Sequence, residues 1–279
     1  IRLRNHVLTM FEQASKEADP VRRERLLTFV IVGGGPTGVE LAGSFRELYD
    51  HVLARDYPGL DFRQVRVILV EATGRILPAL SPELGQKAVA TLQHIGVEVR
   101  LNTTLSGADD EGVILKDGSH IPCATLVWAA GVRASPLADS LHQIPCKNNR
   151  VCLEPSLQMP GYPEIYVVGD MACLEGPDGQ PYPMVAPVAV QMGELAARNI
   201  CRQIAGQSLA SFHYVDRGTM ATIGRRAAVA QVAGLKLSGG IAWLAWLLVH
   251  LMSLVGFRNR VLVLINWAYG YLSYDRGAR

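Results

Sequence analysis

The hydrophobic pattern of residues 1–27 predicts a helix that leads into a folded domain. Apolar residues recur from Leu3 to Phe11 at the three- and four-residue spacing that lines one face of a helix. A charged turn follows around Asp19 and Pro20. We therefore expect a helical lead-in that ends before the next apolar run.

The next run, TFVIV, is short and continuously apolar, which predicts a buried parallel strand. It enters a GxGxxG loop formed by Gly33, Gly35 and Gly38, and a helix-compatible segment follows. Gly33 allows a tight turn, Gly35 lets the backbone approach a pyrophosphate, and Gly38 lets the helix pack closely on the strand. Pro36 and Thr37 complete the loop, where the helix N-terminus offers N–H groups and a positive dipole end to phosphates.

A second predicted strand, VRVILV, ends at Glu71. A carboxylate at this place accepts hydrogen bonds from both ribose hydroxyls of an adenosine and repels a 2′-phosphate, so the sequence favours NAD(H) over NADP(H). Glu71 lies 36 residues after Gly35, more than the roughly 20 of the compact fingerprint. A long first helix and the turn YPGLDFRQ account for the excess. The alternative is an exposed strand-end glutamate without a ligand.

Strand and helix patterns continue to alternate after Glu71, as a doubly wound parallel sheet requires. Ser81 and Pro82 predict the start of a helix that ends near His94, and VEVRL predicts another strand. Residues 107–123 are typical of a hairpin with Asp117-Gly118 at its turn.

Two further strand ends carry candidate cofactor contacts. TLVWAAGV predicts a buried strand finishing at Gly131, where bare backbone lies beside a cofactor; simple close packing explains it equally well. EIYVVGDMA predicts a strand ending in Gly169 and Asp170, and a helix follows about fifteen residues later. In a flavin site, such an aspartate accepts a hydrogen bond from the ribityl chain and Gly169 permits its approach. The alternative is an aspartate that caps a turn.

The last third of the chain changes character. Residues 212–239 alternate and turn like a β-rich connector, and residues 241–257 contain no formal charge. Arg258 and Arg260 precede a second apolar segment. A membrane-spanning helix needs about 20 apolar residues, so the first segment is marginal and the second too short. Two apolar helices with tryptophans and basic flanks fit best in a membrane interface; buried or dimer-forming helices and spanning helices are the alternatives.

Charge and composition support this division. The 279 residues carry a net charge of +2, but residues 214–279 carry +6 and the rest −4. A basic, apolar tail favours an anionic lipid bilayer surface, and the aromatic-basic pattern of a nucleic-acid module is lacking, so we expect no nucleic acid as partner. Scattered histidines predict no metal site. The five cysteines form no CxxC pair, which favours free thiols in a reducing compartment: Cys123, Cys146, Cys152, Cys173 and Cys201.

The segments GGGPTGVELAG, VILVE, WAAGV, IYVVGDMA and RGTMATIGRRAAVA, with the apolar tail after them, resemble type II NADH dehydrogenases. These are single-subunit NADH:quinone oxidoreductases of the pyridine nucleotide–disulfide oxidoreductase superfamily. The resemblance implies an α/β fold with two Rossmann-like domains, for FAD and NADH, and a C-terminal membrane-binding module. The family's first FAD fingerprint has no counterpart here, and the chain opens without a methionine, so we expect a piece of a longer protein.

The resemblance divides the chain into four parts. Residues 1–27 correspond to a helical lead-in and residues 28–140 to the NADH-binding domain. Residues 141–212 correspond to the remaining part of the FAD-binding domain. Residues 213–279 correspond to a β connector and membrane-associating helices.

The resemblance also assigns roles to individual residues. Glu40 matches a family glutamate near the meeting point of nicotinamide, flavin and quinone; the alternative is a helix-N-terminal glutamate stabilised by the dipole. The family's quinone-side helix carries Ala-Gln-x-x-x-Gln, whereas this chain has Ala186-Pro187-x-x-x-Gln191. Gln191 is thus present, and proline replaces the first glutamine, which puts that residue's contact in question. The remaining matches are the pyrophosphate loop of Gly33, Gly35 and Gly38, the ribose acid Glu71, the strand-end Gly131, and Gly169 and Asp170 of the second FAD motif.

The implied function is respiratory electron transport, in which NADH reduces FAD and the flavin passes two electrons to a membrane quinone. The implied location is peripheral, on the cytoplasmic face of the cell membrane. Whether the protein forms a homodimer stays an open question. Two rivals remain: a soluble FAD/NAD(P)H-dependent reductase of an electron-carrier protein, and a non-catalytic membrane-associated NADH-binding module. A disulfide reductase would need a redox cysteine pair, and this chain contains no CxxC. Alone, the fragment is expected to be inactive.

Overall fold

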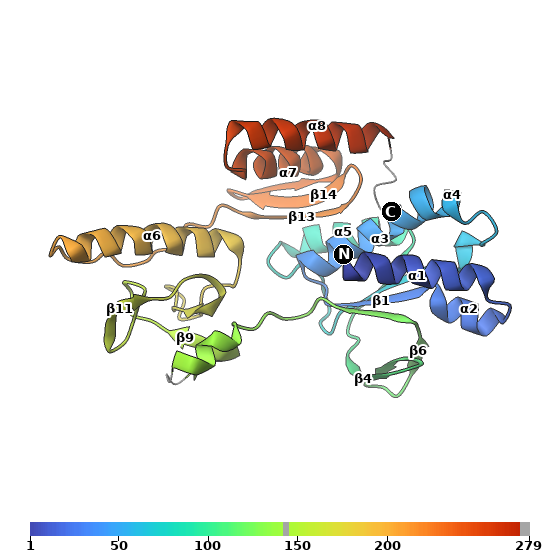
Figure 1. Ribbon diagram of the computed structural model, residues 1–279, viewed down its shortest axis with the longest axis horizontal. Coiled ribbons are helices and arrows are strands. Elements are labelled where there is room, and N and C mark those ends of the chain that lie inside the picture. Colours follow the sequence, from blue (N-terminus) through green and yellow to red (C-terminus); the bar gives the residue numbers. More distant parts are fainter. Residues whose placement is uncertain (142–144, 274–279) are drawn as a thin grey trace. The chain divides into compact units, whose positions relative to one another are not determined.

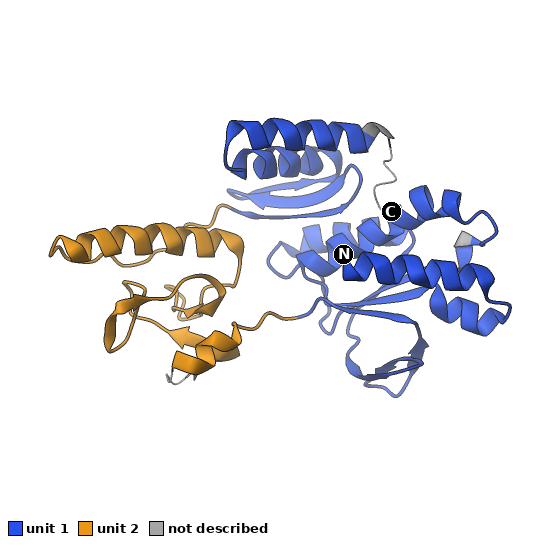
Figure 2. Cartoon of the chain, viewed as in Figure 1, with its two compact units in different colours: residues 1–130, 218–279 blue, residues 131–217 orange. Residues whose placement is uncertain are grey.

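A computed structural model describes residues 1–141 and 145–273, without the side chains of residues 62, 145–147, 272 and 273 (Figure 1). The chain forms two compact units (Figure 2). The first contains residues 1–130 and 218–279, and the second contains residues 131–217. The two units are defined by how the chain packs. The division of the chain into four parts with nucleotide-binding and membrane-associating roles stays a prediction.

A four-stranded parallel sheet forms the centre of the first unit, in the order β3-β2-β1-β7. Ile31 lies opposite Leu69 of one neighbouring strand and Val127 of the other. The expected parallel sheet is therefore confirmed. It is not doubly wound as expected, because helices cover one face and a small antiparallel sheet covers the other. The strands are β1 (Thr28–Val32), β2 (Arg66–Val70), β3 (Val97–Arg100) and β7 (Thr125–Trp128).

Both faces of this sheet are covered, because alternate residues of a strand point to opposite sides. Phe29 and Ile31 pack into the core that the helices share. Val30 and Val32 pack against the small antiparallel sheet of β4 (Leu105–Asp109), β5 (Gly112–Leu115) and β6 (His120–Pro122). The predicted hairpin is thus part of a three-stranded meander, and its turn at Asp117 is confirmed by a side-chain bond to the Ser119 N–H at 2.9 Å.

Strand β7 corrects one expectation. It ends at Trp128, not at Gly131, and Leu126 and Trp128 are 37% and 64% exposed. The predicted buried strand is therefore wrong. The physical reason is position: β7 is an edge strand, so its apolar side chains are less covered than those of β1.

The helices of the first unit surround a cluster of aromatic rings. Phe11 stacks on Phe29 with ring centroids 5.8 Å apart, which anchors the N-terminal helix to β1. The lead-in is two helices, because Asp19 accepts the Val21 N–H and Pro20 begins the second helix. The helical elements are α1 (Arg2–Lys16), α2 (Pro20–Leu26), α3 (Pro36–Leu48), the π-helical turn η1 (Tyr49–Leu53), α4 (Ala54–Asp56), the 3-10 turn η2 (Phe62–Gln64) and α5 (Pro82–His94).

The C-terminal residues of the first unit form an antiparallel sheet followed by two apolar helices. The sheet contains β13 (Thr219–Gly224), β14 (Ala227–Val232) and β15 (Leu235–Ser238). Its residues Ala221, Ile223 and Val229 join the main core, whereas Ala228 and Ala230 pack on Ala242. The helices are α7 (Gly239–Ser253) and α8 (Phe257–Ser273). Among the described residues, no helix combines the length and hydrophobicity needed to cross a bilayer.

The second unit has its own core, built around α6 (Ala186–Ile204). The strand before Gly169 ends earlier than expected, at Tyr166, and Gly169–Met171 forms the 3-10 turn η5. Two small sheets surround this turn, β12-β9-β8 and β10-β11. The remaining elements are η3 (Pro136–Leu141), β8 (Pro145–Cys146), η4 (Lys147–Asn149), β9 (Arg150–Cys152), β10 (Gln158–Met159), β11 (Tyr162–Tyr166) and β12 (Ala172–Cys173).

The cysteines differ in part from the sequence-based expectation. Cys123, Cys173 and Cys201 are free thiols. Cys152 is disulfide-bonded, so the expectation of free thiols is wrong at that position. The sequence spacing did not indicate it, because a disulfide follows from side chains that approach in space. The side chain of Cys146 lies outside the described part of the chain.

Candidate functional site

The glycine loop turns tightly between β1 and α3. Gly33 has φ +111°, and a Cβ there would lie 2.9 Å from backbone atoms of Ala130. At Gly38 a Cβ would lie 1.9 Å from the carbonyl oxygen of Gly33. Both positions therefore exclude any side chain, Gly33 through backbone conformation and contact and Gly38 through close packing of the helix on the loop.

Gly35 stands at the open side of the same loop. It precedes α3 in an extended conformation, and nothing lies within 4 Å of its Cβ position. Pro36 and Thr37, which follow it in the first turn of α3, are exposed. The α3 N-terminus carries no side-chain cap, so its N–H groups and dipole face this open space and favour an anion.

Glu71 lies beside this loop at the end of β2. Its Oε2 accepts the Gly34 N–H at 2.6 Å, and its Oε1 accepts the Thr73 N–H and hydroxyl, both at 2.8 Å. Partial burial raises the pKa of this carboxyl, but bonds from Thr73, Gly34 and the Ala72 backbone outweigh burial and hold the pKa below its usual value. The carboxylate is thus a fixed negative charge next to the phosphate-facing turn.

Two residues of this site were not identified from the sequence. The Gly34 N–H and Thr73 together orient the carboxylate. The triple glycine at positions 33–35 was the available signal, since a Cβ at Gly34 would lie 3.0 Å from Glu71 Oε2 and 2.7 Å from Ile76.

Glu40 lies on the face of α3 that packs on the C-terminal sheet. Its Oε1 accepts the Thr222 N–H of β13 at 3.2 Å. One turn later, a Cβ at Gly43 would lie 1.8 Å from the Ile223 carbonyl oxygen, and Glu47 accepts the Arg225 N–H. Two carboxylates and a glycine thus dock α3 against this sheet, a contact that the motif spacing did not reveal.

The other candidates belong to the second unit. Gly131 and Gly169 adopt positive φ angles of +77° and +71°, and Asp170 is exposed within the turn η5. Gln191 donates to the Val215 carbonyl and accepts the Val215 N–H, both at 3.0 Å. These two hydrogen bonds tie α6 to the segment near residue 215. They give Gln191 a structural role within the unit.

Comparison with known families decides the classification. The family model for pyridine nucleotide-disulphide oxidoreductases matches residues 5–193. The chain belongs to this family. A second model, for the NDH2 C-terminal domain, matches residues 217–273. The resemblance inferred from the motifs is therefore confirmed.

The curated relatives include type II NADH:quinone oxidoreductases. Ndh of Mycobacterium tuberculosis is 41% identical over 99% of this chain and 61% of its own length. The Staphylococcus aureus enzyme is 36% identical over 81% of this chain and 56% of its own length. The chain thus spans about three fifths of the length of these relatives.

Solved structures share the fold. NDH2 from Plasmodium falciparum in complex with NADH superimposes with a TM-score of 0.87 at 17% identity, covering 96% of this chain and 70% of that one. At this level of identity the likeness establishes the α/β fold and not the residue roles.

Proposed function

We propose that this chain supplies the NADH-binding and membrane-associating parts of a flavin-dependent NADH:quinone oxidoreductase. The observation that carries the proposal is the open space at Gly35, bordered by the α3 N-terminus and the Glu71 carboxylate. This combination fits a dinucleotide whose pyrophosphate meets backbone N–H groups and whose adenosine ribose meets a carboxylate. The curated relatives give the same reaction class.

The residues present fit NADH better than NADPH. Gly33 and Gly38 hold the turn, and Gly35, Pro36 and Thr37 present the first turn of α3 to the pyrophosphate. Thr73 and Gly34 occupy three of the roughly four acceptor sites of the Glu71 carboxylate, which leaves one on Oε2 for a ribose hydroxyl. The fixed charge of the carboxylate repels a 2′-phosphate.

For FAD, this chain offers only part of a site. Asp170 is an exposed carboxylate that follows the positive-φ Gly169, which suits an acceptor for a ribityl hydroxyl, and Gly131 presents bare backbone. When bound, the flavin supplies the chemistry, accepting a hydride equivalent and giving up two electrons. Gln191 acts through position, by holding the segment around Val215 on α6.

We assign Glu40 the task of holding a proton for quinone reduction. Its Oε1 is fixed by the Thr222 N–H, which leaves Oε2 as the atom that exchanges the proton. The contact with β13 also orients the carboxylate on α3. Replacement by glutamine keeps the shape and removes the acid.

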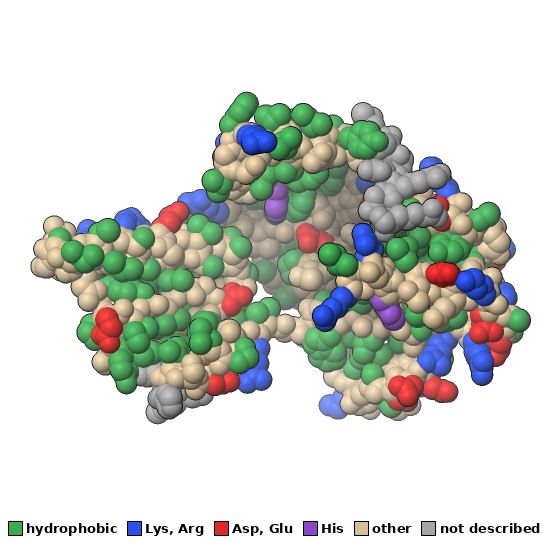
Figure 3. Space-filling view, viewed as in Figure 1, with side chains coloured by type: hydrophobic (Ala, Val, Ile, Leu, Met, Phe, Trp, Pro, Cys, Tyr) green, Lys and Arg blue, Asp and Glu red, His purple; other side chains and the backbone are tan. Residues whose placement is uncertain are grey.

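Helices α7 and α8 suit attachment to a membrane surface. Ile241, Val255 and Phe257 are 70%, 86% and 81% exposed, and apolar side chains gather over both helices in Figure 3. Arg258 and Arg260 lie at the start of α8, where cations attract an anionic bilayer. We infer a peripheral location on the cytoplasmic face of the membrane. A homodimer through the same helices is the competing use of this surface.

The deciding experiment measures NADH oxidation by the full-length protein with a short-chain quinone. We expect quinone-dependent NADH oxidation, with little turnover of NADPH or of a dithiol-disulfide substrate. NADH binding without quinone turnover, in protein that retains its flavin, would contradict the proposal.

Glu40→Gln tests the proton assignment in the same protein. We expect kcat for quinone reduction to fall about a hundredfold, the lower range for loss of a general acid, with a changed pH profile and nearly unchanged NADH affinity. Glu83→Gln, which alters a surface carboxylate paired with Lys236 at 3.2 Å, is the control. An unchanged rate and pH profile in Glu40→Gln would remove Glu40 from the mechanism.

A further inference from the structure

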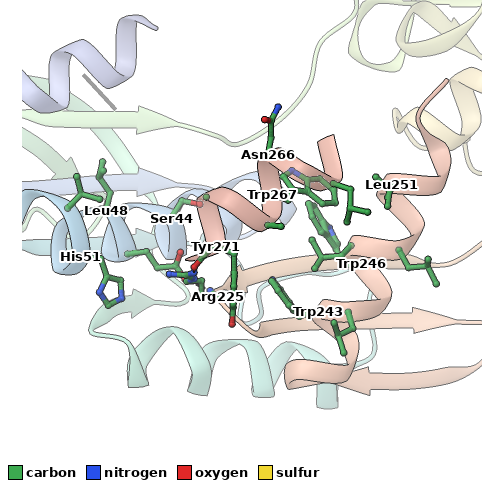
Figure 4. Close-up of a pocket in the computed structure, with 18 residues that line it drawn as sticks. Ser44, Leu48, His51, Arg225, Trp243, Trp246, Leu251, Asn266, Trp267 and Tyr271 are labelled. Carbon is green, nitrogen blue, oxygen red and sulfur yellow. Dashed lines mark hydrogen bonds between the residues drawn. The ribbon is translucent and has the colours of Figure 1, made fainter. Parts of the chain in front are cut away.

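A pocket of about 970 Å³ lies in the first unit, between the end of α3 and the two C-terminal helices (Figure 4). Its volume is at the upper end of the roughly 300–1,000 Å³ of sites that hold small molecules. Neither the glycine loop nor Glu40 lines it. It is therefore separate from the dinucleotide site described above.

Aromatic and leucine side chains form most of its wall. Trp246 lies near Trp267 with ring centroids 6.2 Å apart, and Trp243 lies near Tyr271 at 5.6 Å. Figure 4 shows these rings approaching one another from α7 and α8. A wall of this kind favours an apolar, flexible or flat ligand.

The apolar wall continues onto the outer surface of the two helices. Leu244, Leu248 and Leu264 line the pocket and are still 62%, 61% and 52% exposed. A hydrocarbon chain can therefore pass from a membrane that covers α7 and α8 into the pocket along a continuous apolar path. This step rests on the membrane attachment proposed above.

A cation lies at the other end of the pocket. The Arg225 guanidinium is 4.2 Å from the centre of the Tyr271 ring and donates to the Tyr271 carbonyl. Arg226 lies 5.4 Å from the same ring centre. Glu47 also lines this end, and it accepts the backbone N–H of Arg225, so it positions the loop that carries the guanidinium.

The main-chain irregularity after α3 contributes to the same end. Residues 49–53 form a π-helical turn, and its His51 and Val52 line the pocket with Ser44 of α3. Such turns widen a helix by one residue and often occur at functional sites. The turn adds an imidazole to the polar end, and Ser44 of α3 adds a hydroxyl.

We propose that this pocket binds a single amphiphile made of an acyl chain and an anionic head. The carboxylate or phosphate head pairs with Arg225, and the chain follows the tryptophans towards the exposed leucines. This orientation places the head on the side of the protein body and the chain on the side of the membrane. Both membrane phospholipids and free fatty acids have the required chemistry.

The test measures binding to delipidated full-length protein by native mass spectrometry. The probes are oleate and dioleoylphosphatidylglycerol, with dioleoylphosphatidylcholine as the comparison without net charge. We expect one bound molecule of an anionic probe and at least tenfold weaker binding of phosphatidylcholine. Binding of oleate alone assigns the site to fatty acids, and binding of phosphatidylglycerol identifies a phospholipid site.

Two glycine substitutions distinguish binding of the probe in the pocket from binding elsewhere on the protein surface. Gly270→Leu fills the pocket, because Gly270 lines it in α8 and nothing lies within 4 Å of its Cβ position. Gly240→Leu is the matched control in α7, where the Cβ would meet only the Arg226 carbonyl at an ordinary 3.8 Å. We expect loss of the single bound molecule in the first variant and retention in the second.

Arg225→Gln tests whether Arg225 binds the anionic head of the ligand. Arg225→Lys, which keeps the positive charge, is the matched control. We expect about tenfold weaker binding of the anionic probe in the glutamine variant and near-normal binding in the lysine variant. The proposal is overturned if Gly270→Leu binds like the unsubstituted protein, if phosphatidylcholine binds equally well, or if no probe binds.

Co-sedimentation with phosphatidylglycerol vesicles distinguishes failure of the pocket proposal from failure of the proposed membrane attachment. Stoichiometric probe binding without co-sedimentation contradicts membrane attachment and leaves the pocket standing. Co-sedimentation with unchanged probe binding in Gly270→Leu contradicts the pocket alone.

Discussion

Helix α3 uses glycine for opposite purposes along its length. At Gly35, before its first turn, the space around the absent side chain is open. At Gly43, in its middle, the same space is occupied by the Ile223 carbonyl of β13. One glycine leaves room for a ligand, and the other leaves room for the protein's own backbone.

The difference teaches how to separate binding from folding in this unit. In the proposed binding mode, a methyl group at Gly35 would meet the pyrophosphate and no protein atom, whereas a methyl group at Gly43 would force α3 and β13 apart. Glu71 gives a third case, because its carboxylate contacts the glycine loop and also faces the expected ribose. The three positions should therefore respond differently to equally small changes.

The largest effect is expected for Gly43→Ala. The new Cβ would lie 1.8 Å from a carbonyl oxygen, and overpacking of this kind lowers the free energy of unfolding by about 3 kcal/mol. Urea denaturation measures the change. The control is Gly193→Ala in α6, where nothing lies within 4 Å and the same exchange should raise stability by about 0.5 kcal/mol. Equal stability of both variants would contradict the tight contact.

Glu71→Gln should weaken NADH binding about thirtyfold, or about 2 kcal/mol, as expected for loss of a charge-assisted bond. The preference over NADPH should shrink because the repelling charge is gone. Isothermal titration with both nucleotides tests this, and an unchanged NADH/NADPH ratio would contradict the assignment.

The pH dependence of this variant follows from the lowered pKa of Glu71. A carboxyl whose pKa is lower in the folded state stabilises the fold above its unfolded pKa and loses that contribution as pH falls through the folded value. The stability difference between the unsubstituted protein and Glu71→Gln should therefore be present at neutral pH and disappear in acid below the ordinary carboxylate range. Urea titrations across that range measure it.

Gly35→Ala should have the smallest effect on the fold. Its φ of −72° and ψ of 178° suit alanine, so the free energy of unfolding should change by less than about 1 kcal/mol. NADH affinity should fall about tenfold, or about 1.4 kcal/mol. Binding unchanged by this methyl group would show that the pyrophosphate does not approach Gly35.

Much of this unit was predictable because its signals are local. The apolar run of β1, the glycine spacing and the proline at the start of α5 each specify structure within a few residues, and the structure confirms them. The exposure of β7 was not predictable in the same way. Its apolar run resembles that of β1, and only its place at the sheet edge explains why Trp128 is exposed.

The site was predicted in part for the same reason. The glycines and Glu71 come together through adjacent parallel strands, a geometry that the motif implies. The bonds of Gln191 to Val215 and of Glu40 to Thr222 depend on segments distant in sequence. No spacing rule connects such segments, so these contacts required the structure.

The return of residues 218–279 to the first unit has a consequence for synthesis of the chain. Ala221, Ile223 and Val229 complete the core that β1 and α3 begin, but the ribosome makes all of residues 131–217 first. Until β13 emerges, the packed face of α3 around Gly43 has no partner strand. The nascent chain therefore passes through a stage with exposed apolar surface on the first unit, the kind of surface that chaperones bind.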